Sequence, residues 1–237
     1  MKLYVYCVAE DVETLDQPIL GISGAAVRVL KLKDLSLLVT DLETDAVPVT
    51  GDNALAHAAV VRSILDRTTP LPFRFGTVVG EEQLGNYVSA REAALKAKLA
   101  ELRGCIEMSV KIISDQIQPE PRPQDPAQGP GATFLAAKRR EILGDESNAA
   151  RAAEVSQWLH KQLSSLIRNE QVTLRPTDKM ILSAAHLVER GKVGLYREKL
   201  AEMRQNRRDL HFLLSGPWPP YSFANIELEL KTQFGVS

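Results

Sequence analysis

The residue types that carry out most enzyme chemistry are scattered along this chain rather than grouped. Its four histidines occur singly, without a His-Glu-x-x-His pair, and its acids and cysteines show no metal-ligand spacing. No serine lies in a Gly-x-Ser-x-Gly turn, and no Gly-x-x-x-x-Gly-Lys loop could hold a phosphate. Gly21-Ile22-Ser23-Gly24 falls short of a dinucleotide-binding fingerprint. The sequence therefore predicts no catalytic residue, no cofactor and no metal site, and a protein that is not an enzyme.

The densest recognition signal is the stretch from Ser215 to Phe223, which reads Ser-Gly-Pro-Trp-Pro-Pro-Tyr-Ser-Phe. Each proline fixes φ and removes a backbone donor, so the preceding strand must stop and the segment is stiff. We expect Trp218 and Phe223 to pack on the protein's own core. Tyr221 has a polar tip and is expected to be partly exposed. Trp218 and Tyr221 are also candidate partner-binding residues, since aromatic side chains dominate binding hot spots.

Arg74 is the third candidate partner-binding residue. It lies between Phe73 and Phe75, and strand alternation would place both phenylalanines on one face and Arg74 on the other. Its planar guanidinium could hold a carboxylate of a partner through two hydrogen bonds. Alternatively, it could tie down a loop of its own domain, which is the role we favour. Gly76, which follows, is expected to permit a turn or a close backbone approach.

Two histidines lie within apolar patterns. His57 is about one helical turn from Val60 and Val61 and about two turns from Ile64, and His186 lies inside an apolar strand. The simplest interpretation of His57 is a half-buried side chain that bonds to the backbone or to a carboxylate. His186 is interpreted as structural too.

Several of these residues together resemble a known family. Leu210–Phe223 is similar to the C-terminal signature of the gas vesicle protein F/L family (GvpF/GvpL), most specifically at Pro217–Phe223, and Pro70–Val79 is similar to a second block of that family. The opening strand Tyr4–Tyr6 and His57 also fit, in the family's order along the chain. Cys7 departs from the pattern, because glycine is expected there. The chain most resembles GvpF.

This resemblance implies a function. A GvpF-like protein is a non-enzymatic accessory or minor structural protein that takes part in gas vesicle assembly. Its implied partners are the gas vesicle shell protein and other gas vesicle accessory proteins, and neither nucleic acid nor a lipid membrane. Its implied location is cytoplasmic, at the gas vesicle.

The second half of the chain predicts an antiparallel sheet. Apolar and polar residues alternate over 106–112, which is the period of a half-buried strand. The segments that follow suggest a β-α-β-β-α-β order over 105–216, as in a ferredoxin-like fold. We expect a helix over about 133–168, strands at 172–174, 180–188 and 210–214, and a helix over 193–203. The predicted domain is 105–237, with a proline-rich loop at 116–131 and the proline and aromatic segment at its end.

The first half, 1–104, predicts a separate α+β domain. Strands are expected at 3–8, 27–30 and 35–39, with Lys33-Asp34 turning the last two into a hairpin. Gly51-Asp52 is expected to cap a helix that runs to Asp66. A second helix should end at Gly104.

Composition limits the remaining alternatives. The 237 residues are 44% hydrophobic and 25% charged, as in an ordinary globular protein, and no apolar stretch is long enough for a transmembrane helix. A net charge of −1 argues against bulk nucleic-acid binding. Arginines and lysines concentrate over 190–208, however, so a ferredoxin-like regulatory or RNA-binding module stays open as the alternative.

Overall fold

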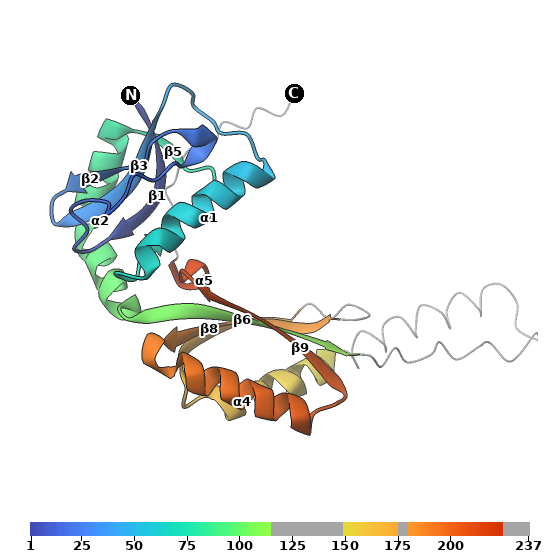
Figure 1. Cartoon of the computed structure of the whole chain (residues 1–237). Coiled ribbons are helices and arrows are strands. Elements are labelled where there is room, and N and C mark those ends of the chain that lie inside the picture. Colours follow the sequence, from blue (N-terminus) through green and yellow to red (C-terminus); the bar gives the residue numbers. More distant parts are fainter. Residues whose placement is uncertain (115–148, 175–179, 225–237) are drawn as a thin grey trace, which may run out of the picture. The chain divides into compact units, whose positions relative to one another are not determined.

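The computed structural model describes residues 1–114, 149–174 and 180–224. The chain divides into two compact units, of which the first is Met1–Glu107 together with the chain from Pro217, and the second is Met108–Gly216. Each unit combines helices with an antiparallel sheet (Figure 1). The predicted α+β class is therefore confirmed.

The first unit is built around a five-stranded sheet, in which β1 (Lys2–Ala9) is an inner strand with neighbours on both sides. Its strands follow the order β2-β3-β1-β4, and all of the neighbouring pairs are antiparallel. On the side of β1 away from β3, β4 pairs with the end of β1 and β5 with its beginning. The strands are β1 (Lys2–Ala9), β2 (Arg28–Leu32), β3 (Leu35–Leu42), β4 (Leu71–Pro72) and β5 (Val78–Gly80).

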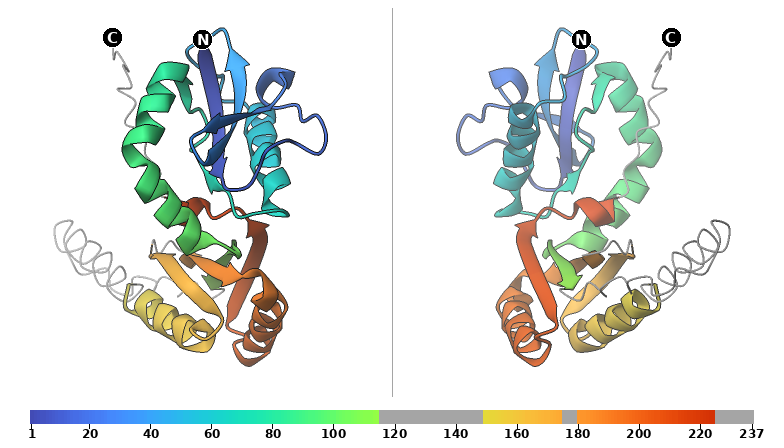
Figure 2. Two further views of the ribbon diagram at one scale, coloured as in Figure 1. Left: turned by 90° about the vertical axis from the view of Figure 1, so that its left-hand side faces the viewer. Right: turned by 90° about the vertical axis from the view of Figure 1, so that its right-hand side faces the viewer.

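Helices cover both faces of this sheet. Figure 2 shows α1 (Gly51–Leu65) and α2 (Glu81–Leu102) on opposite sides of it. Every residue of β1 from Leu3 to Ala9 is consequently buried. A strand covered on both faces reads as a continuous apolar run rather than an alternation, and the sequence Leu-Tyr-Val-Tyr-Cys-Val-Ala fits that rule.

The tyrosines of β1 need hydrogen-bond partners because they are buried. The register between β1 and β3 shifts between Val5 and Cys7, which marks an irregularity at Tyr6. The hydroxyl of Tyr6 accepts the Ile22 N–H at 2.9 Å and lies 2.9 Å from Thr40 Oγ1. Thr40 in turn donates to the Ala26 carbonyl at 3.2 Å. This chain of bonds satisfies the hydroxyl and fixes the loop around η1 (Ile22–Gly24) on the sheet.

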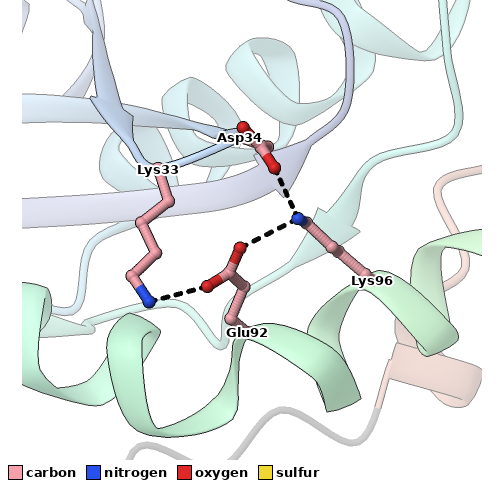
Figure 3. Close-up of polar contacts among 4 residues, drawn as sticks. All are labelled: Lys33, Asp34, Glu92 and Lys96. Atoms are coloured by element: carbon pink, nitrogen blue, oxygen red, sulfur yellow. Dashed lines mark hydrogen bonds and ion pairs between the residues drawn. The ribbon is translucent and has the colours of Figure 1, made fainter.

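The predicted hairpin at Lys33-Asp34 is confirmed. Leu32 pairs with Leu35, and Lys33 adopts a positive φ of 54° in the turn. Figure 3 shows how charges join this turn to α2: Glu92 lies between the ammonium groups of Lys33 and Lys96, at 2.7 and 2.8 Å, and Lys96 also contacts Asp34 at 2.7 Å. The hydrogen bond from Lys33, followed by that from Lys96, lowers the pKa of Glu92. The network is exposed, so it orients the turn more than it stabilises the fold.

The start of α1 differs slightly from expectation, whereas the end of α2 agrees with it. Thr50, and not Gly51 or Asp52, caps α1, because its side chain accepts the Asn53 N–H. The C-terminal end of α2 agrees with the prediction, since the helix stops at Leu102 and Gly104 follows with a φ of 74°.

The second unit has a four-stranded sheet in the order β7-β8-β6-β9. The predicted strands at 106–112 and 210–214 therefore lie in one sheet, next to each other. Two helices lie on the same face of this sheet (Figures 1 and 2). One includes residues 149–163, and the other is α4. The bounds are β6 (Cys105–Ser114), β7 (Ile167–Thr173), β8 (Met180–Glu189), α4 (Val193–Asn206) and β9 (Leu210–Trp218).

One helix boundary was wrongly predicted. The helix expected to run to Arg168 ends at residue 163, and β7 starts at Ile167. Leu159, Leu163 and Leu166 keep a helical spacing. The helix nevertheless ends before Leu166 is included, because Ile167 pairs with Val188 and starts a strand. The proline-rich loop at 116–131 lies outside the described residues, as does the predicted helix before residue 149.

The end of the chain groups differently from the predicted domains. We expected the second domain to extend to residue 237, whereas the chain from Pro217 belongs to the first compact unit. The reason is local packing: Phe223 is buried and Ser222 bonds to Glu107, both within the first unit. The limits of the two domains as folding units stay a prediction.

The described helices were also compared with the length that a bilayer requires. None of the helices within 1–114, 149–174 and 180–224 is both long and apolar enough to cross a membrane.

Gly21 provides a test of the packing around Tyr6. A Cβ at position 21 would lie 1.9 Å from the Tyr6 hydroxyl oxygen, so Gly21→Ala should lower the free energy of unfolding by about 1–3 kcal/mol. Gly85→Ala is the matched control, because it lies inside α2 with nothing within 4 Å of the added Cβ. That change should stabilise the protein by about 0.5–1 kcal/mol. Urea unfolding of both variants measures the difference, and equal effects would contradict the packing argument.

Candidate partner-binding surface

The proline and aromatic segment returns to the first unit as a short, ordered turn. β9 runs through Pro217 and ends at Trp218, so the expectation that the strand stops before the first proline is wrong. The next two residues are buried prolines, and α5 (Tyr221–Ala224) follows. The Tyr221 N–H donates to the Pro219 carbonyl at 2.7 Å, and the Phe223 N–H donates to the Pro220 carbonyl at 3.1 Å. These bonds fix the positions of the three aromatic side chains.

A buried carboxylate anchors this turn. Glu107, which is only 6% exposed, accepts the Ser222 N–H at 2.8 Å and the Ser222 hydroxyl at 2.9 Å. Bonds to an ionised acceptor are roughly twice as strong as neutral ones. Next to this contact, Phe223 is buried and α5 packs against β4. Phe223 therefore packs on the core of the first unit, as expected.

Tyr221 lies over a cluster of aromatic rings around His57. Its ring centroid is 6.4 Å from that of His57, and the rings of Tyr4, Tyr6 and Phe75 lie 5.7, 5.7 and 5.9 Å from His57. Tyr221 closes this cluster but keeps 38% of its surface exposed. The prediction that Tyr221 is partly exposed is confirmed.

His57 is more deeply buried than expected, its Nδ1 bonds to the Tyr4 hydroxyl, and the backbone of Phe73 also interacts with its ring. The Tyr4 hydroxyl accepts the Gly76 N–H at 3.1 Å and lies 2.9 Å from His57 Nδ1. Either group can donate in this contact, because a phenol hydroxyl and a neutral imidazole nitrogen can each donate or accept. No described residue bonds to Nε2 with good geometry.

Burial sets the protonation state of His57. Desolvation lowers its pKa to about 4, although the nearby backbone of Phe73 partly offsets the shift. Desolvation also raises the pKa of Tyr4. Both groups are therefore neutral at pH 7, and the pair serves as a buried polar contact.

The block around Arg74 forms a turn rather than a regular strand. The Arg74 carbonyl accepts both the hydroxyl and the N–H of Thr77, at 2.7 and 3.3 Å, and Gly76 takes a φ of 85°. The expectation that Gly76 permits a turn is confirmed. The prediction that the phenylalanines share a face is wrong, because Phe73 meets Tyr87 on α2 whereas Phe75 meets His57 on α1. Arg74 itself is exposed.

Trp218 is less buried than predicted. It keeps 38% of its surface exposed, and the guanidinium of Arg62 lies over its ring, 5.8 Å from the centroid. The flanking prolines are buried instead. The first unit thus carries Trp218 and Tyr221 close to α1, where they contact Arg62 and His57 respectively. Sequence reasoning named both aromatic residues but missed Arg62, which has no local motif.

Other groups in the described residues do not form a reactive site. His186 is fully buried and lies 2.6 Å from the Tyr196 hydroxyl through Nδ1, so a proton relay there would have no access to substrate. A hollow of about 340 Å³ lies between α1 and the loop at Leu15–Ile19, away from Trp218 and Tyr221. Within the described residues, no group of three or more histidines, cysteines or acids could hold a metal ion.

Comparison with known proteins identifies the family. The sequence matches the family described as Gas vesicle synthesis protein GvpL/GvpF over residues 2–225. The chain belongs to this gas vesicle protein family. The resemblance to GvpF and GvpL is therefore confirmed.

Relatives match nearly the whole chain. Gas vesicle protein F1 of Halobacterium salinarum is 25% identical over 239 residues, covering 99% of this chain and 98% of the relative. Gas vesicle protein L of a Streptomyces species is 26% identical over 252 residues, covering 95% and 94%. Crystal structures of GvpF from Anabaena and Microcystis aeruginosa have TM-scores of 0.77 and 0.75. They are 20% and 21% identical, cover 95% of this chain, and are covered to 97% and 99%, which shows a shared fold.

The burial of His57 predicts that the first unit loses stability in acid. Its pKa falls from 6.5 to about 4 on folding, so the unfolded chain binds the extra proton between these values. Stability should therefore decrease as the pH falls from about 6.5 to about 4, by about 3 kcal/mol from this residue. Urea unfolding followed by Trp218 fluorescence in a Trp158→Phe background measures the loss.

His57→Gln should flatten this pH dependence, since glutamine can accept the Tyr4 proton but does not titrate. His160→Gln is the control, because His160 is exposed and belongs to the second unit. An unchanged pH dependence in His57→Gln would contradict the assignment.

Phe223 is buried and Trp218 is partly exposed, so truncating each of them to alanine should have a different effect on stability. Phe223→Ala should lower the free energy of unfolding by about 3–5 kcal/mol, as large aromatic truncations in cores do. Trp218→Ala should lower it by about 1–2 kcal/mol at most and leave the protein folded, because much of the ring already faces solvent. Thermal unfolding followed by circular dichroism measures the stability loss of each variant. A larger loss for Trp218 would show that it is the core residue.

Proposed function

We propose that this protein is a non-enzymatic accessory or minor structural protein of gas vesicles, which assists their assembly by binding the shell protein and other gas vesicle proteins. The family match over residues 2–225 carries this proposal. The named relatives are gas vesicle proteins F and L, and they match the chain along nearly all of their length. The expected location is the cytoplasm, at the vesicle.

The exposed aromatic residues supply a physical basis for binding. Trp218 and Tyr221 each keep 38% of their surface exposed, although the backbone on both sides is fixed by buried contacts. Tryptophan, tyrosine and arginine are the residues most often found at binding hot spots. A fixed aromatic side chain loses little entropy on binding. We propose Trp218, Tyr221 and Arg74 as partner-binding residues.

The second unit supports a ferredoxin-like assignment, which we propose for it. The strand order β7-β8-β6-β9 and two helices on one face are those of a split β-α-β arrangement. Its basic helix does not favour the RNA-binding alternative. Arg204 donates to the Phe212 carbonyl, and Arg207 pairs with Asp209 and stacks on Trp158. These cations are used within the unit.

Pull-down against each protein of a gas vesicle gene cluster tests the function. We expect the wild-type protein to retain the shell protein, and Trp218→Ala to weaken binding by about 30-fold, as the loss of a hot spot does. Leu195→Ala is the control, because Leu195 is an exposed apolar residue of the second unit. The proposal would fail if the wild type retained none of these proteins, or if RNA were retained in a salt-dependent manner instead.

A further inference from the structure

Arg62 lies on the exposed face of the last full turn of α1 and covers the ring of Trp218. Both residues belong to the first unit. The positive charge of the guanidinium is attracted to the ring quadrupole of Trp218. The N–H donors lie in the plane of the group, so they stay available around its edge.

These donors have no acceptor among the residues that the structure describes. Asp66 follows Arg62 by one helical turn, yet the two side chains form no ion pair. Three other arginines of the unit have a carboxylate partner, namely Arg28 with Asp41, Arg67 with Asp16 and Arg103 with Glu10, whereas Arg91 lies over the Tyr87 ring. Arg62 is therefore a positioned cation whose charge the described part of its own chain leaves unpaired.

The surface beside Arg62 is apolar. Going back along α1, Ala59, Ala58 and Leu55 lie three, four and seven residues earlier, which places them on the same helix face. Leu55 is 70% exposed, and the alanines permit a close approach of another backbone. At the other end of this face lies the half-exposed ring of Trp218.

We propose that Arg62, held by Trp218, binds a carboxylate side chain of a partner segment. The partner's apolar residues would lie along Leu55–Ala59, so the ligand is an amphipathic helix with an acidic residue at the end of its apolar stripe. The planar guanidinium matches a carboxylate through two parallel hydrogen bonds. The site rests on the proposed function in one respect, because it assigns this helix to a gas vesicle protein.

A pair of synthetic peptides tests the carboxylate directly. One is an amphipathic helix whose leucine stripe ends in glutamate, and the other has glutamine at that position. NMR titration of the labelled full chain should shift the side-chain N–H signals of Arg62 and the indole N–H of Trp218. We expect the glutamate peptide to bind at least about 10-fold more tightly, since one charged hydrogen-bonded pair is worth about 1.4 kcal/mol or more. Equal binding, or no shift at Arg62, would overturn the proposal.

Variants at Arg62 then test the same contact with gas vesicle proteins in the pull-down. Arg62→Glu should abolish retention, and Arg62→Lys should weaken it about 10-fold, because lysine keeps the charge but lacks the planar fork. The matched control is Arg91→Glu, which changes the same charge in a stacked arginine, since Arg91 lies 4.7 Å from the Tyr87 ring on α2. Circular dichroism confirms that each variant is folded.

The outcomes separate this inference from the proposed function. If the wild type and Arg62→Glu retain a gas vesicle protein equally well, the carboxylate site is wrong while the function stands. If no gas vesicle protein is retained but the glutamate peptide binds selectively at Arg62, the function is wrong while the carboxylate site stands.

Discussion

The buried Glu107 carboxylate fixes the part of the molecule on which the functional argument depends. Its two oxygens take the N–H and the hydroxyl of Ser222, a residue 115 positions later in the chain. A carboxyl group that is almost fully buried needs such hydrogen bonds, because a buried polar group without partners destabilises the fold. The contact therefore determines where the segment from Pro217 lies on the first unit. Trp218 and Tyr221 owe their positions to it.

Around this anchor, the same segment divides its residues between core and surface. Phe223 and the two prolines after Trp218 are buried, whereas Trp218 and Tyr221 stay half exposed. Burying the backbone neighbours removes the freedom that an exposed aromatic side chain would otherwise lose on binding. The packing of the segment and its proposed recognition role are therefore complementary, and the same prolines serve both.

Local signals explain which elements could be predicted from the sequence. The Lys33-Asp34 hairpin and the glycine after α2 depend on neighbouring residues, and both were predicted. The end of the helix near residue 163 was not, because helical spacing continues into Leu166 while pairing with β8 decides the outcome. The alternation over 106–112 also implied that Glu107 faces solvent. Its burial depends on a segment far along the chain, which no local pattern contains.

His57 shows why a buried titratable group need not imply catalysis. Its Nδ1 bonds to the Tyr4 hydroxyl, its ring is enclosed by aromatic side chains, and burial lowers its pKa to about 4. A general base requires access to a substrate proton as well as a suitable pKa, and His57 has neither. The second unit repeats the arrangement with His186 and Tyr196, again fully buried. In each unit a buried histidine bonds through Nδ1 to a buried tyrosine hydroxyl, whereas Arg62 keeps an exposed charge that a partner can reach.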